Sequence, residues 1–580
     1  VRIDDLELVE LPPPGAPRPD PVVSASSTLR GHEPSSVLEG GAGWAPDAGD
    51  GERWIALDFG DTREYGGLII DWERPAADYV VEASDDGDEW RALRTVRGGN
   101  GGRDYHYLPE SESRRLRVRL LGAPEGPPPR LMRLFVQPLE WSATREAFFA
   151  AIARDAPRGC YPRGISGEQS YWTVVGLDGD TRESLFNEDG MIETGPERFS
   201  LEPFLFWNGR LVTWADVDLE ASLAAGFLPL PTVTWVRDDV RLTIEPVAIG
   251  ESGASSVSVR YTVRNTEAGR ARGSLFLALR PFQTNPPSQT LNTIGGTARI
   301  REMRRDGDAV LVNGERAVIC ATPPDSFGAV SFDGGDIVVD HLRRGVSGPA
   351  APVQDPFEAA SGALAWTLDL AAGTERAVDI VFPLHPGGTA DRAGLTAARE
   401  RARSEWESRL GRVTFDLPPS ARELEETLKA QLGWILVNRA GPALQPGARA
   451  YARSWIRDGS LTSSALLRLG HADVVREFIN WYAPHQYDDG KVPCVVDRRG
   501  ADPVPEHDSH GEFIFLVAEY WRYTGDRTSL ELLWPWVAAA AGYLDTLRQQ
   551  RRTPEWEGPE RREFWGILPP SISHEGYSAK

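Results

Sequence analysis

Three short segments near the end of the chain combine carboxylates, aromatic rings and histidines. They are residues 454–459, 506–510 and 573–577. Hydrolysis of a glycosidic bond needs one carboxylic acid to protonate the leaving oxygen and one carboxylate to activate water or attack the sugar. Planar charged groups bind sugar hydroxyls, and aromatic rings stack on sugar faces. The candidate catalytic residues are Glu575, Asp508 and Glu506, and the candidate sugar contacts are Trp455, Arg457, Asp458, His510, His574 and Tyr577.

Five predicted helices must position these segments. The apolar periodicity predicts helices over residues 419–438, 459–469, 471–483, 510–524 and 535–550. Pro535 would then lie in the first turn of the last helix, where proline is tolerated. The connections between helices alternate between long and short, so in an up-and-down array the long loops all leave at one end. Because functional residues concentrate on such loops, we expect the three segments to meet at one rim.

The segment after the first of these helices carries a recognisable element. Residues 455–459 read Trp-Ile-Arg-Asp-Gly and resemble the Trp-x-Arg-Asp element of the six-hairpin, glucoamylase-like (α/α)6-barrel glycosidases. The resemblance covers about residues 161–580, because the family also places a β-sandwich and a linker helix before the barrel. It implies that Arg457 and Asp458 hold the hydroxyls of the innermost sugar and that Trp455 walls the pocket.

The same resemblance suggests which carboxylate acts as the general acid. In this family the acid lies on the loop after the fifth helix, where the present chain has Glu575. The resemblance implies a pKa raised by a closed, partly apolar loop, as a general acid needs. Glu506 and Asp508 are second candidates, or acceptors for substrate hydroxyls. The family usually inverts the anomeric centre with an attacking water and uses no cofactor.

The barrel of this family has twelve helices, and residues 417–580 leave room for about half of them. The general base of the family lies on a loop before the last helix, and no such region occurs before residue 580. A half-barrel would expose the apolar faces of its helices. We therefore expect the sequence to be a fragment whose second carboxylate lies further on; a complete chain of this length would not be expected to hydrolyse sugars.

Residues 1–140 have a different sequence pattern, in which short apolar runs alternate with Gly- and Asp-rich turns. This pattern predicts an antiparallel sandwich. Residues 25–27, 54–60 and 84–90 and the Arg-rich strand 114–122 resemble the landmarks of the discoidin, or coagulation-factor type C, carbohydrate-binding sandwiches. That family often carries a structural calcium near an Asp-Gly turn, whereas the matching turn here is Glu39-Gly40. Two alternatives stay open: the sandwich binds sugar, or it only docks onto its neighbour.

The remaining segments complete a multidomain β + α architecture. Residues 141–160 are expected to be a connector, 161–390 a large two-sheet β-sandwich, 391–416 a charged linker helix and 417–580 the first part of the barrel. Strands are predicted at residues 255–266, 273–282, 335–342 and 375–384 from their apolar alternation and runs. The Pro-rich loop 280–287 either only leaves the sandwich or reaches the site of the helical region. A stripe formed by Leu424, Leu428, Leu432, Ile435 and Leu436 predicts the buried face of the first barrel helix.

Composition limits the partners. The net charge of −22 argues against nucleic acid and anionic lipid, which require basic surfaces, whereas neutral sugars meet no such barrier. No apolar run is long enough to insert in a membrane. The two histidines His507 and His510, with Asp508, are a candidate metal site, but a third ligand at metal spacing is absent, so no metal is expected. Sugar binding favours a location outside the cytoplasm, although no signal peptide is visible.

Two other functions compete with a carbohydrate-binding glycoside hydrolase. A phosphorylase on the same barrel would replace water by phosphate and would need a basic cluster near the pocket. A non-catalytic sugar-binding or adhesion protein would need only the discoidin-like module. The sugar, the linkage and the anomer are left open by the sequence.

Overall fold

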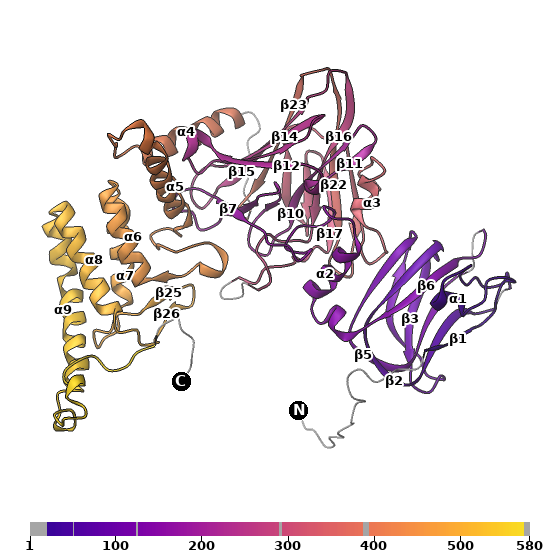
Figure 1. The fold of residues 1–580 in the computed structure, drawn as a ribbon, viewed down its shortest axis with the longest axis horizontal. Helices are drawn as coiled ribbons and strands as arrows, with labels where there is room; N and C mark the ends of the chain where they lie inside the picture. The colour runs from indigo at the N-terminus through magenta and orange to yellow at the C-terminus, as the bar shows by residue number, and fades with distance from the viewer. Residues whose placement is uncertain (1–19, 50, 123–125, 289–292, 387–393, 573–580) are drawn as a thin grey trace. The chain divides into compact units, whose positions relative to one another are not determined.

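The computed structural model describes residues 20–49, 51–122, 126–288, 293–386 and 394–572. Contacts divide the chain into two units. Unit 1 comprises Val1–Asp155 and Ser331–Ile337, and unit 2 comprises Ala156–Val330 and Val338–Lys580. Each unit is described separately below (Figure 1).

Unit 1 is an antiparallel β-sandwich, drawn in indigo and purple in Figure 1. Breaks in the pairing of its two longest strands, between Asp58 and Arg63 and between Tyr65 and Gly67, allow those strands to bend around the core. The strand order is β1-β2-β5-β3-β4, with β6 paired to β2. The elements are β1 (Val22–Ala25), α1 (Ser36–Glu39), β2 (Arg53–Arg74), β3 (Asp78–Ser84), β4 (Arg91–Arg97), β5 (Gly102–Leu120), β6 (Arg130–Gln137) and α2 (Arg145–Asp155).

The alternation in the Arg-rich strand is confirmed. Leu116 and Val118 are buried in the core of the sandwich, whereas Arg117 and Arg119 point to the other face and form ion pairs with Glu82. Period-2 alternation thus correctly identified a half-buried strand.

Unit 2 begins with a larger sandwich of two sheets. One sheet has the order β20-β22-β16-β10-β9-β8-β7, with β11 paired to β10. The other has the order β12-β13-β14-β15-β23-β19-β18-β17-β21. The strands of the first sheet are β7 (Trp172–Val175), β8 (Ser184–Asn187), β9 (Ile192–Glu193), β10 (Ser200–Trp207), β11 (Arg210–Val212), β16 (Ala271–Arg280), β20 (Ser326–Val330) and β22 (Ser361–Leu370). Those of the second are β12 (Asp218–Leu223), β13 (Pro231–Val236), β14 (Val240–Ile249), β15 (Ser256–Asn265), β17 (Glu302–Asp306), β18 (Ala309–Val312), β19 (Glu315–Cys320), β21 (Val353–Gln354) and β23 (Glu375–Pro383).

Three of the four strands predicted for this region are present, as β15, β16 and β23. The prediction of a strand at residues 335–342 is wrong, because Val338–Leu342 form the short helix α3. Val338, Val339 and Leu342 are all buried, on one side of that helix. A short apolar run does not by itself distinguish a strand from a buried helix.

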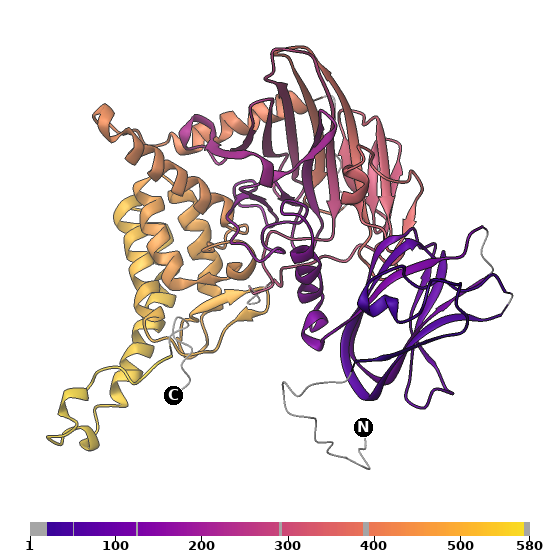
Figure 2. The same ribbon diagram turned by 45° about the vertical axis from the view of Figure 1, so that its right-hand side comes forward.

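The helical region follows the sandwich, in orange and yellow, and α6 to α9 stand side by side (Figure 2). A small sheet of order β24-β25-β26 lies beside these helices. None of the described helices combines the length and apolar character that a membrane crossing requires. The elements are α4 (Leu395–Leu410), α5 (Arg422–Asn438), β24 (Ser454–Trp455), α6 (Ile456–Arg468), α7 (Ala472–Tyr482), β25 (Val495–Asp497), β26 (Gly500–Ala501), α8 (Ser509–Thr524) and α9 (Arg527–Gln549).

The predicted start of the last helix is wrong. The last helix starts at Arg527, capped by the side chain of Asp526, so Pro535 lies in its interior rather than in its first turn. A proline there gives up one backbone hydrogen bond, and burial of Leu533 and Val537 in the helical core supports the helix on both sides of it.

The predicted buried stripe of α5 holds only in its second half. Leu432 and Leu436 are buried, but Leu424 is 71% exposed and Leu428 is 40% exposed. Periodicity identifies the face that can be buried, and only the neighbouring elements decide how much of it is covered.

One buried arginine ties the helical region to the sandwich. Arg449, in the loop between α5 and α6, donates to Glu193 at 2.7 Å and to Glu183 at 2.9 Å. Its backbone has a φ of +62°, which is uncommon for a residue other than glycine. Glu193 also accepts a hydrogen bond from the backbone N–H of Asn285 at 2.8 Å. The Pro-rich loop 280–287 therefore contacts the same glutamate that anchors the loop leading to α6.

Candidate functional site

The Trp-Ile-Arg-Asp segment forms the junction between β24 and α6. Trp455 ends β24 and occupies the N-cap position of α6, so Arg457 and Asp458 lie in the first turn of that helix. Trp455 is 5% exposed and packs with Cys494 and Val495. Pairing of β24 with β25 and burial of the indole thus fix the start of the helix and the direction of its first turn.

The second segment meets the first at Arg457. Its guanidinium lies 3.4 Å from the carboxylate of Glu506 and 3.8 Å from that of Asp458. Glu506 is 4% exposed. A charge this buried requires a partner, and Arg457 supplies one. The structure therefore brings together three of the residues that the sequence singled out.

The start of α8 adds two histidines to this region. His510 is fully buried, and its Nδ1 atom accepts the backbone N–H of Val492 at 3.1 Å. Burial lowers the pKa of His510 to about 4, so the imidazole is neutral at physiological pH. Burial also lowers the pKa of His507, opposed by a hydrogen bond to the backbone of Pro570. Asp508 occupies the N-cap position without a side-chain capping hydrogen bond.

Sequence reasoning missed Glu512, one turn into α8. Burial, followed by the charge of Asp508, raises its pKa to about 8, with further contributions from Glu506 and Asp458 and opposition from Arg457. The available signal was its spacing of four residues from Asp508, which places both carboxylates on one face of the helix.

Unpaired polar atoms gather in this region. Most buried polar atoms in proteins have a hydrogen-bond partner, so several unpaired ones close together in the chain call for an explanation. In the described residues, the buried atoms without a hydrogen-bond partner include Trp455 Nε1, His507 Nδ1, Ser509 Oγ, His510 Nε2 and Glu512 Oε2. A polar ligand or water that bonds to some of these atoms would account for them.

The third predicted segment, residues 573–577 with His574, Glu575 and Tyr577, lies outside the described residues. The chain leading to this segment is described, and the backbone N–H of Ile572 donates to the carbonyl of Pro505 at 3.1 Å. This bond holds Ile572 beside the segment that carries Glu506.

Metal ligands do not cluster in the described part of the chain. There, no group of three or more His, Cys, Asp or Glu side chains is arranged to hold a metal ion.

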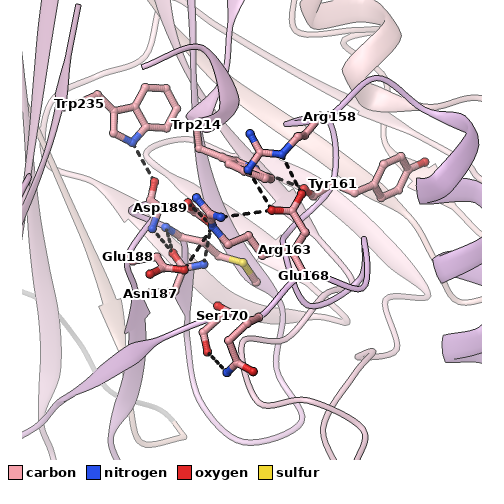
Figure 3. Close-up of polar contacts among 12 residues, drawn as sticks. Arg158, Tyr161, Arg163, Glu168, Ser170, Asn187, Glu188, Asp189, Trp214 and Trp235 are labelled. Carbon is pink, nitrogen blue, oxygen red and sulfur yellow. Dashed lines mark hydrogen bonds and ion pairs between the residues drawn. The ribbon is translucent and has the colours of Figure 1, made fainter. Parts of the chain in front are cut away.

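A second cluster of charged groups lies in the sandwich of unit 2 (Figure 3). Arg163 donates to Asp189 at 2.8 Å and lies 3.2 Å from both Glu188 and Glu168. Its guanidinium also stacks on the ring of Trp214, 4.3 Å from the ring centroid. Glu168 is also paired with Arg158 at 2.8 Å, whereas Asp189 and Glu188 share Arg163 with it.

This crowding affects Asp189, which is 2% exposed. Burial raises its pKa to about 6, with Glu188 and Glu168 adding to the effect and Arg163 opposing it. Trp235 donates its indole N–H to the backbone carbonyl of Asp189 at 2.8 Å. Because the described members of the cluster bond mainly to one another, we interpret it as part of the sandwich framework.

The Asp189→Asn variant should lose a pH dependence of stability that the wild-type chain has. A carboxyl whose pKa rises from 3.8 to about 6 on folding stabilises the fold at low pH, and this contribution is lost as the pH rises through 6. Relative to the variant, the wild-type free energy of unfolding should fall by about 2 kcal/mol between pH 4 and pH 7. Urea unfolding at several pH values measures the difference. In Asp239→Asn the sign should reverse, and the difference should appear as the pH falls below about 4, because a hydrogen bond from Arg237 lowers the pKa of Asp239.

The N-terminal part of the chain matches a known family model. Residues 22–132 match the F5/8 type C domain. No curated protein matches the chain significantly.

Solved structures are similar to about a fifth of the chain. A chitosan-binding module of a chitosanase/glucanase from Paenibacillus sp. IK-5, in complex with chitotriose, is 21% identical over 20% of this chain and 96% of that one, with a TM-score of 0.19. The Clostridium perfringens module CpGH89CBM32-5, in complex with GalNAc-β-1,3-galactose, is 14% identical over 20% and 94%, with a TM-score of 0.18. A Ruminococcus gnavus GH29 fucosidase, in complex with fucose, is 19% identical over 20% and 25%, with a TM-score of 0.19.

The predicted discoidin-like domain is therefore confirmed for residues 22–132 of the predicted range 1–140: these residues form an F5/8 type C, discoidin-like domain.

Proposed function

We propose that this chain belongs to a glycoside hydrolase that inverts the anomeric centre of an oligo- or polysaccharide, and that residues 417–580 are the first part of its (α/α)6 barrel. The observation that carries the proposal is the meeting of two distant segments, residues 454–459 and 506–510, with Ile572 held beside them. Arg457 pairs with Glu506 at 3.4 Å, and Ile572 is hydrogen bonded to Pro505, next to Glu506.

Each residue has a role in the proposed reaction. Arg457 and Asp458 bind hydroxyls of the terminal sugar, and Trp455 walls the pocket beside them. Glu575 is the general acid that protonates the glycosidic oxygen as the bond to the anomeric carbon breaks. Glu506 accepts a hydrogen bond from a substrate hydroxyl and remains ion-paired with Arg457.

The charge balance of the site favours water over phosphate as the attacking group. Near Arg457, the described side chains include the carboxylates of Asp458, Glu506 and Asp508. Phosphate binding needs an excess of positive charge or several N–H donors at one place. A phosphorylase is therefore the weaker candidate.

We further propose that the F5/8 type C domain binds carbohydrate and holds the enzyme on its substrate. The support is the family match over residues 22–132 together with the family's use as carbohydrate-binding sandwiches. If the domain bound sugar while the helical region showed no turnover, the non-catalytic adhesion protein would be the better description.

One screen separates these functions. The full-length gene product is incubated with a panel of neutral, amino and acidic oligosaccharides, with and without inorganic phosphate, and the products are identified by mass and by NMR of the anomeric proton. A hydrolase releases reducing sugar of inverted configuration without phosphate. Formation of a sugar phosphate only in the presence of phosphate would instead establish a phosphorylase. Binding without turnover on every substrate would contradict the enzymatic proposal.

A further inference from the structure

Glu512 differs from the neighbouring carboxylates in how its inner oxygen is placed. It lies in the first turn of α8, on the same helix face as Asp508. Its Oε2 atom is buried and has no hydrogen-bond partner among the described residues. A charged oxygen left there without a partner would cost far more free energy than a neutral one. The geometry alone therefore favours the uncharged form of this side chain.

The charges that face Glu512 act in the same direction. Asp508 on its own helix, Asp458 on α6 and Glu506 before α8 all oppose its ionisation. The opposing cation is Arg457, whose guanidinium already lies near the carboxylates of Glu506 and Asp458. An ionised Glu512 would add a fourth negative charge to those of Asp508, Asp458 and Glu506, with Arg457 as the opposing cation. The proton is therefore retained most easily on Glu512, whose buried oxygen has no hydrogen bond.

The facing group from α7 adds no charge. Tyr482 interacts electrostatically with Glu512, and burial raises the pKa of its phenol well above the ordinary value. Its hydroxyl donates to the backbone carbonyl of Pro493 at 3.0 Å. Tyr482 is therefore a neutral, already bonded neighbour that does not compensate an ionised Glu512.

We propose that Glu512 enters the saccharide site as an uncharged carboxylic acid and donates a hydrogen bond to an oxygen of the bound sugar. The inference rests on the proposed function and names a residue that positions the substrate. A protonated carboxyl has one O–H donor, whereas ionised carboxylates only accept. A sugar hydroxyl both donates and accepts. A sugar hydroxyl that donates a hydrogen bond to Asp508 or Glu506 can therefore accept a hydrogen bond from Glu512. This pair of hydrogen bonds selects ligands with hydroxyl groups over anionic ligands.

The first test needs no ligand. Urea unfolding of the 580-residue chain is measured from pH 5 to pH 9 for the wild type and for Glu512→Gln. A carboxyl with a pKa raised from 4.5 to about 8 stabilises the fold at low pH and loses this contribution as the pH rises through 8. The wild-type folding constant should fall relative to the variant, by up to about tenfold per pH unit within that window. Coincident profiles would show that Glu512 is ionised and would overturn the proposal.

Two further variants sharpen this test. Asp508→Asn removes the neighbouring charge that raises the pKa of Glu512 most. The pH at which the unfolding profile bends should therefore be lower in this variant than in the wild type. Glu519→Gln is the matched control on the same helix, because Glu519 is ion-paired with Arg522 at 2.9 Å. Its profile should follow that of the wild type. A Glu519→Gln profile resembling that of Glu512→Gln would assign the effect to the helix in general and would contradict the proposal.

The second test measures binding of the tightest oligosaccharide found in the screen. The affinity of the wild type should fall about tenfold per pH unit above pH 8, because the donor is lost on ionisation. Glu512→Gln keeps an N–H donor and should bind with no pH dependence, whereas Glu512→Ala should bind weakly throughout. Affinity of the wild type that stays constant from pH 7 to pH 9.5 would overturn the hydrogen bond. If no sugar binds at all, the proposed function fails together with this hydrogen bond, and the unfolding profiles still report the charge of Glu512.

Discussion

Replacing Glu575 by Gln should lower the turnover of the preferred oligosaccharide by about 10²–10⁴-fold, the usual contribution of a general acid. Gln has nearly the same shape and still forms hydrogen bonds, but it has no proton to give to the glycosidic oxygen. The Michaelis constant should change little, since the loss concerns the transition state. Steady-state kinetics on the full-length gene product measures both quantities.

The nature of the leaving group makes this prediction specific. A substrate whose leaving group departs as a stable anion needs no protonation, so Glu575→Gln should hydrolyse such a substrate almost as fast as the wild type does. The matched control is Glu560→Gln, which changes an exposed glutamate in the same segment after α9. Unchanged turnover of the natural substrate in Glu575→Gln would remove the general-acid role, and Glu506 and Asp508 would be tested next in the same way.

Replacing Glu193 by Ala should lower the free energy of unfolding by about 3–5 kcal/mol, as expected when one partner of a buried ion pair is removed. Glu193 is fully buried and Arg449 is 3% exposed, so the guanidinium would lose a neutralising partner that water cannot replace. The loop between α5 and α6, which leads to Trp455, would also lose an anchor. We therefore expect weaker substrate binding in the same variant, measured beside denaturant unfolding.

Two comparisons check that burial causes this effect. Glu315→Ala breaks an ion pair with Arg198 in which the glutamate side chain is 65% exposed, and it should cost no more than about 1 kcal/mol. The double variant Glu193→Ala/Arg449→Ala should be less destabilised than the sum of the two single changes, because removing both charges leaves neither unpaired. Additive effects would contradict the coupling.

Local patterns predicted much of the secondary structure because they depend on neighbours in the sequence. Arg117 and Arg119 alternate with buried residues, and this alternation alone predicts a half-buried strand. The helices of the C-terminal region follow from apolar spacing in the same way, and their predicted boundaries differ from those observed mostly by a few residues. The exceptions are α3 and the start of α9, where a short apolar run and a proline gave ambiguous local signals.

Leu424 shows where local patterns stop being informative. Its spacing matches that of Leu432, yet it is 71% exposed while Leu432 is buried. The sequence gives every member of the stripe the same expectation. Only the elements packed against α5 determine which of its leucines are covered.

By itself, the sequence determined which residue types occur at 454–459, 506–510 and 573–577 and how they are spaced, because these are local properties, and from them we predicted a saccharide site. The tertiary structure decided which charges meet there. Glu193 and Arg449 are separated by 256 positions in the sequence, and no local pattern near either residue predicts that they pair. The protonation of Glu512 likewise depends on burial and on the charges that folding brings around it. Burial and electrostatic fields depend on distances in space, and only the folded chain defines those.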